Sequence, residues 1–109
     1  MASNFNNAAV QDLATTFATV YTAPATAGNT AVIHGLTFAN KSAYIRYVDF
    51  KVQTAASANK AIIGLNIPIP SGSTLTFPAK INLLAGEKLV AKADSATSID
   101  VFVSVLENT

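Results

Sequence analysis

Short runs of β-branched and aromatic residues, each closed by a turn signal, follow one another from Leu13 to the end of the chain. The turn signals recur at intervals of roughly 8–12 residues, and no segment keeps a helical period over three turns. Residues 43–53 alternate most clearly, with Val48, Phe50 and Val52 on one face. Seven or eight such strands predict an all-β fold, a single-domain antiparallel β-sandwich of the jelly-roll or immunoglobulin-like kind.

Eight segments are expected to form strands. They cover residues 13–22, 30–40, 43–53, 61–69, 74–77, 80–84, 88–93 and 99–107. The last two are expected to pair as a hairpin across the turn at 94–98. The segment 61–69 carries no charge, and Pro68 favours an edge or strand-end position because proline cannot donate to a sheet ladder.

Gly35 interrupts the segment 30–40. A glycine inside a strand indicates a bulge or a close approach of two backbones. Simple alternation along this segment would place four side chains on one face, namely those of Val32, His34, Leu36 and Phe38.

The first twelve residues show neither a strand period nor a helical one, and asparagines surround Phe5. We expect residues 1–12 to form an extended N-terminal arm, followed by a β-sandwich domain of residues 13–109. Phe5 and Val10 are the side chains that would anchor this arm on a neighbouring molecule. The alternative is a frayed end with no partner.

The chain is poor in charge. Charged residues make up 12% of its 109 residues, against about 25% in an average soluble domain, whereas half of the residues are hydrophobic. A surface of this kind is typical of a subunit that is packed against other molecules. The formal net charge of +1 gives no electrostatic case for binding nucleic acid or an anionic membrane. No apolar run approaches the roughly 20 residues of a membrane-spanning helix.

Catalytic and metal-binding chemistry has little support in the sequence. The chain has no cysteine and one histidine, His34, so one chain can form neither a thiolate site nor a histidine cluster. His34 lies in the middle of a strand with no nucleophile motif nearby, which favours a structural histidine over a catalytic base. Glu87, Asp94 and Asp100 lie near one another in the sequence, but Asp94 falls in a turn and Asp100 at an outward strand position. Both are interpreted as solvated residues rather than as members of a carboxylate pair or a calcium loop. We therefore expect no enzyme activity, no catalytic residue, no cofactor and no metal.

Tyr44, Arg46 and Tyr47 stand close together in the sequence. One arginine is too little for a nucleic-acid surface, whereas tyrosine and arginine are enriched where proteins contact one another. The residues expected at a protein interface are Phe5, Val10, Tyr44, Arg46 and Tyr47. The same tyrosines leave open a carbohydrate-binding β-sandwich, although the chain has no tryptophan.

Strand and turn motifs over about two thirds of the chain resemble one known family. They lie at TTFATVYTAPATAGNTAVIHGLTFAN (15–40), NIPIPSGSTL (66–75) and KINLLAGEKLVAKADSATSIDVFVSVLE (80–107). These stretches are similar to small virion structural proteins of tailed bacteriophages, including phages of marine and freshwater bacteria. Residues 41–65 are the least similar part.

The resemblance implies a β-sandwich subunit of a phage particle, and the role that it favours is a capsid decoration, or cement, protein. Such proteins bind the outer shell, often as trimers at local threefold axes, and lock neighbouring major capsid subunits. The implied partners are the major capsid protein or other virion subunits together with further copies of this chain. The implied location is the virion, assembled in the host cytoplasm. A neck, collar or tail subunit, or a carbohydrate-binding adhesin, is the alternative.

Overall fold

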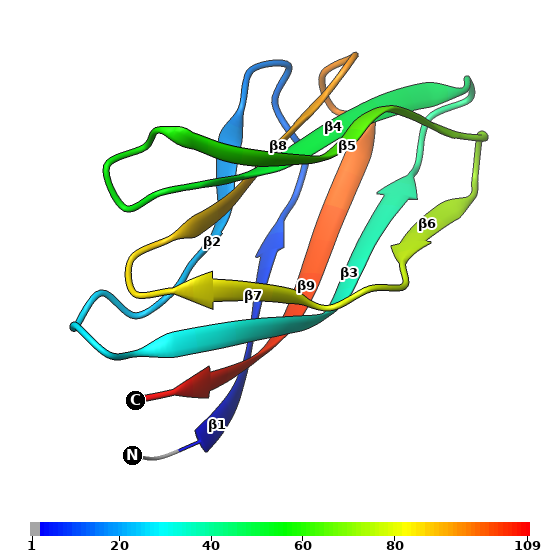
Figure 1. Ribbon diagram of the computed structural model, residues 1–109. Helices are drawn as coiled ribbons and strands as arrows, with labels where there is room; N and C mark the ends of the chain where they lie inside the picture. The colour runs from blue at the N-terminus through cyan, green and yellow to red at the C-terminus, as the bar shows by residue number, and fades with distance from the viewer. Residues whose placement is uncertain (1–2) are drawn as a thin grey trace.

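The computed structural model describes residues 3–109 as nine strands in two antiparallel sheets (Figure 1). The strands are β1 (Ser3–Val10), β2 (Ala18–Thr22), β3 (Thr30–Asn40), β4 (Arg46–Gln53), β5 (Asn59–Ile69), β6 (Thr74–Phe77), β7 (Ile81–Leu84), β8 (Lys88–Ala93) and β9 (Ile99–Asn108). Sheet A has the order β1-β9-β3-β6, with β7 also paired to β3. Sheet B has the order β2-β8-β4-β5. The predicted all-β antiparallel sandwich is confirmed.

The order of the strands selects the jelly roll over the immunoglobulin-like alternative. β6 and β7 pair with different halves of β3, so together they act as one interrupted strand. The chain then crosses between the sheets at almost every connection, from β1 in sheet A to β2 in sheet B and back to β3. β4 and β5 are the one consecutive pair that stays within a sheet. Two four-stranded sheets linked in this way form a jelly roll.

The core lies between the sheets and is built from alternate residues of their central strands. β9 contributes four buried β-branched side chains, those of Ile99, Val101, Val103 and Val105. At the centre, the Phe38 and Phe50 rings lie 4.9 Å apart between centroids, and Phe77 meets Phe50 edge-to-face at 5.6 Å. This period of two is the alternation that the sequence predicts for these strands.

Gly64 on β5 is a position where the packing requires glycine. A Cβ atom at residue 64 would lie 2.4 Å from Cε1 of Phe50, whose ring is held by Phe38 and Phe77 and cannot move aside. We expect Gly64→Ala to lower the free energy of unfolding by about 1–3 kcal/mol, the usual cost of overpacking a core. Urea unfolding followed by circular dichroism measures this change.

Gly35→Ala is the matched control for this experiment. A Cβ atom at residue 35 would meet Cβ of Ser104 at 3.5 Å, which is an ordinary contact. We expect a change within about 0.5 kcal/mol. Equal losses of stability in the two variants would contradict the close packing of the Phe50 ring on β5.

β3 contains the bulge that Gly35 predicts. Its register against β9 shifts between Ile33 and Gly35, so the side chains change face at this point. Ala31 and Ile33 point into the core before the bulge, and Leu36 and Phe38 do so after it. His34 is therefore exposed on the outer side. The expectation that Val32, His34, Leu36 and Phe38 share one face is wrong, because simple alternation ignores the extra residue.

Two further expectations differ from the structure. β8 and β9 do not form a hairpin: β8 pairs with β2 and β4 in sheet B, whereas β9 pairs with β1 and β3 in sheet A. The expected arm is, over Ser3–Val10, a regular edge strand that pairs with β9 along its whole length. Residues 1 and 2 of that arm lie outside the described residues.

Candidate interaction surface

The outer face of sheet A is almost free of charge. Its outward side chains alternate with core residues along each strand and are those of Ser3, Phe5, Asn7, Ala9, Thr30, Val32, His34, Thr37, Ala39, Thr74, Thr76, Asn82, Leu84, Phe102, Ser104, Leu106 and Asn108. We call this set the uncharged face. Within residues 3–109, the one lysine, arginine or acidic residue on the outward side of these strands is Asp100, at the border of the set.

Aromatic side chains are the most prominent groups of the uncharged face. Phe5 is 79% exposed, and its ring meets the His34 ring edge-to-face with centroids 5.8 Å apart. Phe102 stands between two shallow hollows, one of about 260 Å³ toward Phe5 and one of about 370 Å³ toward Ala39. Exposed aromatic groups beside hollows that can receive a partner's side chains are typical of a protein interface.

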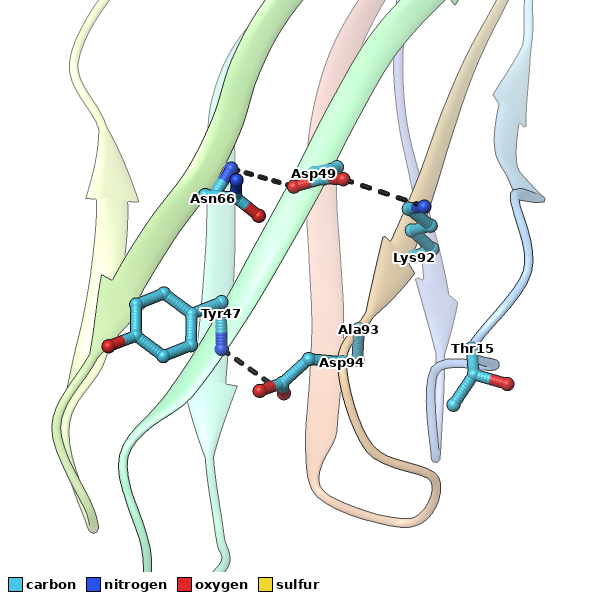
Figure 2. Close-up of a pocket in the computed structure, with 7 residues that line it drawn as sticks. All are labelled: Thr15, Tyr47, Asp49, Asn66, Lys92, Ala93 and Asp94. Atoms are coloured by element: carbon cyan, nitrogen blue, oxygen red, sulfur yellow. Dashed lines mark hydrogen bonds and ion pairs between the residues drawn. The ribbon is translucent and has the colours of Figure 1, made fainter.

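The outer face of sheet B carries charge and contrasts with sheet A. The Phe17 ring lies between two lysines, with the Lys51 Nζ 3.9 Å and the Lys92 Nζ 5.0 Å from its centroid. Lys92 Nζ also lies 3.7 Å from Asp49 Oδ2, while Asp49 Oδ1 accepts a hydrogen bond from the Asn66 backbone N–H at 2.7 Å (Figure 2). The two faces of the sandwich therefore present different chemistry to a partner.

A small hollow of about 170 Å³ lies on the sheet B side beside Tyr47 (Figure 2). Its polar lining includes Asp49, Asn66 and Asp94. Asp94 is held by two contacts with Tyr47: its Oδ1 accepts from the Tyr47 N–H at 3.2 Å, and its own N–H donates to the Tyr47 carbonyl at 3.0 Å. An aromatic ring beside carboxylates and an amide offers both a stacking surface and hydrogen-bonding groups to a small polar ligand.

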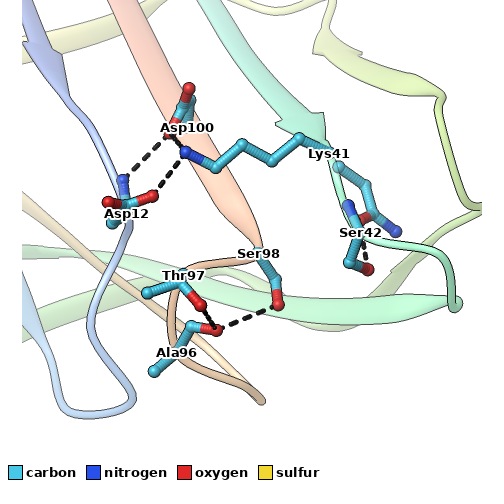
Figure 3. Close-up of polar contacts among 8 residues, drawn as sticks. Asp12, Lys41, Ser42, Ala96, Thr97, Ser98 and Asp100 are labelled. Atoms are coloured by element: carbon cyan, nitrogen blue, oxygen red, sulfur yellow. Dashed lines mark hydrogen bonds and ion pairs between the residues drawn. The ribbon is translucent and has the colours of Figure 1, made fainter.

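Lys41 joins the loop after β1 to β9 (Figure 3). Its Nζ contacts Asp12 Oδ1 and lies 2.9 Å from Asp100 Oδ1, which also accepts the Asp12 backbone N–H at 2.9 Å. The Asp12 N–H and the Lys41 ammonium hold the pKa of Asp100 below its usual range, and the two carboxylates raise the pKa of Lys41. All three side chains are about half exposed, so this cluster fixes the position of Asp12 more than it adds stability.

Glu87 is a buried acid at the turn between the sheets. Its Oε2 accepts from Lys60 Nζ at 2.6 Å and its Oε1 from the Leu84 backbone N–H at 2.9 Å. The Lys60 ammonium, followed by the Leu84 N–H, lowers the pKa of Glu87. Because this pKa is lower in the folded chain than in the unfolded one, the contact stabilises the fold above about pH 4.5 and is lost as the pH falls through the folded-state pKa.

We expect Glu87→Gln to lower the free energy of unfolding at pH 7 by about 1 kcal/mol, because the amide makes weaker contacts than the carboxylate. The difference from the native chain should shrink toward zero at strongly acidic pH, where Glu87 is itself neutral. Urea titrations of both chains at neutral and acidic pH measure it. A difference that does not change with pH would contradict the ionised contact.

The structure separates the residues expected at an interface into two groups. Phe5 belongs to the uncharged face, and Val10 is half-buried against the core beside it. Tyr44, Arg46 and Tyr47 gather at one end of sheet B, where Arg46 Cζ lies 5.4 Å from the centroid of the Tyr44 ring. Tyr44 is 68% exposed. An interface at these five residues stays a prediction.

Phe102 is the residue of this surface that sequence reasoning missed. It follows Val101 and precedes Val103, both of them buried, so alternation alone places it on the outer face. An aromatic residue at the outward position of a central strand was the available signal. Leu84 on β7 is a second outward apolar residue that sequence reasoning missed, and it is half exposed.

The two long edge strands, β1 and β5, differ in how they are protected. β5 lies at the edge of sheet B, as Pro68 predicts, and its register against β4 shifts at three places. Prolines and bulges discourage pairing with another chain. In the part of the chain that the structure describes, β1 has no proline, no charged residue and no register shift. β1 is therefore the less protected edge.

Residues 3–109 contain no group of three or more histidine, cysteine or acidic side chains that could hold a metal ion. They also contain no helix long and apolar enough to cross a membrane.

No protein-family model matches this chain, and no curated protein matches its sequence. Its fold, however, matches solved structures. A chain from Bacillus endospore appendages, described as disulfide-linked pili, has a TM-score of 0.62 at 13% identity over 98% of this chain and 88% of that one. A chain from the capsid of Helicobacter pylori bacteriophage KHP30 has a TM-score of 0.57 at 11% identity over 98% and 87%.

The Drosophila NLP-core, whose structure concerns pentamer formation and histone binding, gives a TM-score of 0.54 at 13% identity over 99% of this chain and 98% of that one. The sequence identities are low, so these matches describe the fold. Together with the strand order, they identify the chain as a jelly-roll β-sandwich of the architecture found in a phage capsid, a bacterial pilus and the NLP-core.

Proposed function

We propose that this chain is a non-enzymatic structural subunit of a tailed-phage virion, and that it acts there as a capsid decoration protein. The single observation that carries the proposal is the uncharged face. An extended face without charge makes a free subunit prone to aggregate, whereas it suits a subunit that is packed in an assembly. The jelly-roll architecture shared with a phage capsid and a pilus subunit supports a structural, oligomer-forming role. The motif resemblance to small virion proteins supports the phage setting.

The mechanism would be stabilisation by mass action. A protein that binds the assembled capsid shell, and not its free subunits, shifts the equilibrium toward the shell. The uncharged face would make the apolar contacts, with Phe5 and Phe102 filling pockets on the major capsid protein or on a further copy of this chain. The charged face of sheet B would stay toward solvent and keep the particle soluble.

Immunogold labelling of virions tests this proposal. Antibodies raised against the purified chain are applied to virions of the tailed phage that encodes it. We expect gold particles over the whole capsid surface. Labelling confined to the neck or tail would favour the neck, collar or tail role, and virions without label would contradict a virion role altogether.

A carbohydrate-binding adhesin is the second candidate, and the hollow beside Tyr47 favours it. Tyr47 is 39% exposed and stands next to Asp94 and Asn66. Binding of the purified chain to a glycan array, lost in Tyr47→Ala and retained in Tyr44→Ala, would support this function. If the purified chain bound no glycan on the array, the carbohydrate-binding function would be contradicted.

A further inference from the structure

β1 is held to the domain almost entirely by its ladder with β9. Eight residue pairs join the two strands, from Ser3 with Asn108 to Val10 with Val101. Six of the eight side chains of β1 are exposed, and those of Ala8 and Val10 are only half-buried. β9, in contrast, buries every second side chain in the core. Of these two strands, β1 is thus the one that can leave while the core stays intact.

Every group that the β1 side chains contact is also present in each other copy of the molecule. Ser3 Oγ donates to Asn108 Oδ1 at 2.7 Å, and Asn6 Nδ2 donates to Glu107 Oε2 at 3.4 Å, both on β9. The Phe5 ring meets His34 on the neighbouring strand β3. A β1 strand from another copy would find the same partners in the same register.

The chain is fixed immediately after β1. Asp12 has a left-handed backbone (φ 57°), and its N–H and carboxylate are held by Asp100 and Lys41 (Figure 3). The next residue, Leu13, is fully buried and donates its N–H to the Ile99 carbonyl at 2.7 Å. Gln11 is exposed and lies between β1 and this anchor, so it is the position at which the chain would turn if β1 left its own β9.

We propose that, in the assembled protein, β1 of one copy pairs with β9 of the next copy instead of with its own. This inference rests on the self-association that is part of the proposed function. The occupant of the vacated β9 edge is a second copy because the sequence of β1 already matches that edge at eight positions. β1 carries no charge, so no repulsion between copies opposes the exchange.

The dimensions of the molecule allow this exchange. Eight extended residues span about 26 Å at roughly 3.3 Å per residue. The two shorter extents of the domain are 26 and 20 Å, so β1 reaches across one molecular width. Each copy would donate one strand and accept one, which makes the contact head-to-tail. Such a contact closes into a ring when its rotation permits, and otherwise propagates as a chain.

A cysteine pair across the ladder tests the exchange. The chain has no cysteine of its own, and Asn7 and Ser104 lie directly opposite each other with their side chains on the outer face. Asn7→Cys/Ser104→Cys is purified and assembled under reducing conditions, then oxidised, denatured and run on a non-reducing gel. We expect most of the chain to migrate as disulfide-linked multimers.

The other outcomes separate the exchange from self-association itself. If the oxidised chain is assembled on a sizing column but migrates as a monomer with an internal disulfide, β1 pairs with its own β9 and the exchange is overturned. If the double variant and the native chain both stay monomeric on the column, self-association fails and the exchange fails with it.

Thr37→Cys/Thr76→Cys is the matched control. These residues are also direct partners on the outer face of sheet A, but they lie on β3 and β6, which stay within one copy. We expect the control pair to form internal disulfides only, and the single variants Asn7→Cys and Ser104→Cys to form no multimers. Multimers in the control pair would mean that chance contacts between copies link the chains, and would contradict the exchange.

Discussion

Replacing Phe102 by lysine is expected to weaken self-association at least a hundredfold. Phe102 is 47% exposed in the single chain, and it stands between the two hollows of the uncharged face. In an assembly that buries this face, the lysine at position 102 would lose its hydration. Within residues 3–109, the one acidic residue on the outward side of the sheet A strands, Asp100, already forms an ion pair with Lys41, so the new ammonium would have no free acidic partner. An unpaired charge of this kind costs about 3 kcal/mol or more, and each 1.4 kcal/mol is a factor of ten in the association constant.

Sedimentation equilibrium of the native chain and of Phe102→Lys measures the two association constants. Thr19→Lys is the control, because Thr19 is exposed on β2 of sheet B and the substitution adds the same charge outside the uncharged face. We expect the control to associate like the native chain. If the two substitutions weakened association equally, an added charge would oppose association wherever it lies on the molecule, and the uncharged face would not be the site of contact.

Truncating Phe50 to alanine is expected to lower the free energy of unfolding by about 3–5 kcal/mol. Phe50 is 2% exposed, and its ring packs against Phe38, Phe77 and the backbone of Gly64. The loss would be a large share of the roughly 5–15 kcal/mol that stabilises a typical domain. Urea unfolding followed by circular dichroism measures the change.

Phe5→Ala is the matched control for Phe50→Ala. Phe5 is 79% exposed and contacts only the His34 ring among aromatic groups of the described chain. We expect its truncation to change the free energy of unfolding of the monomer by no more than about 0.5 kcal/mol. A loss as large as that of Phe50→Ala would show that β1 is docked much more firmly than its exposure indicates.

Most strands could be predicted because their residues alternate. β6 and β8 match the segments expected at 74–77 and 88–93, and the inward valines of β9 are confirmed as core residues. Alternation is a local property, so the sequence of each strand is enough to reveal it.

The pairing of the strands could not be predicted in the same way. The turn at 94–98 suits either a hairpin or a crossing between sheets, because β8 and β9 each offer one apolar face to the core. β1 is a strand for a reason that lies elsewhere in the chain: β9 presents an open edge to Ser3–Val10, whose own residues show no strand period. Such long-range effects are outside the reach of local patterns.

The candidate surface was only partly visible in the sequence. The shortage of charge predicts a packed subunit, but it does not say on which face the shortage falls. That depends on how the sheets divide the strands, which places Lys51 and Lys92 on sheet B and Phe102 on sheet A. The bulge at Gly35 then adds His34 to the uncharged face, beside Phe5.

The mass of the purified native chain in solution, measured by light scattering behind a sizing column, tests most directly whether the uncharged face is an assembly surface. We expect a defined oligomer whose mass is two or more times 11.3 kDa, with the trimer favoured for a capsid decoration protein. A single species at 11.3 kDa that stays monomeric and soluble up to millimolar concentration, and that also binds no phage shell or tail, would contradict this expectation, because the uncharged face would then remain in water without a partner.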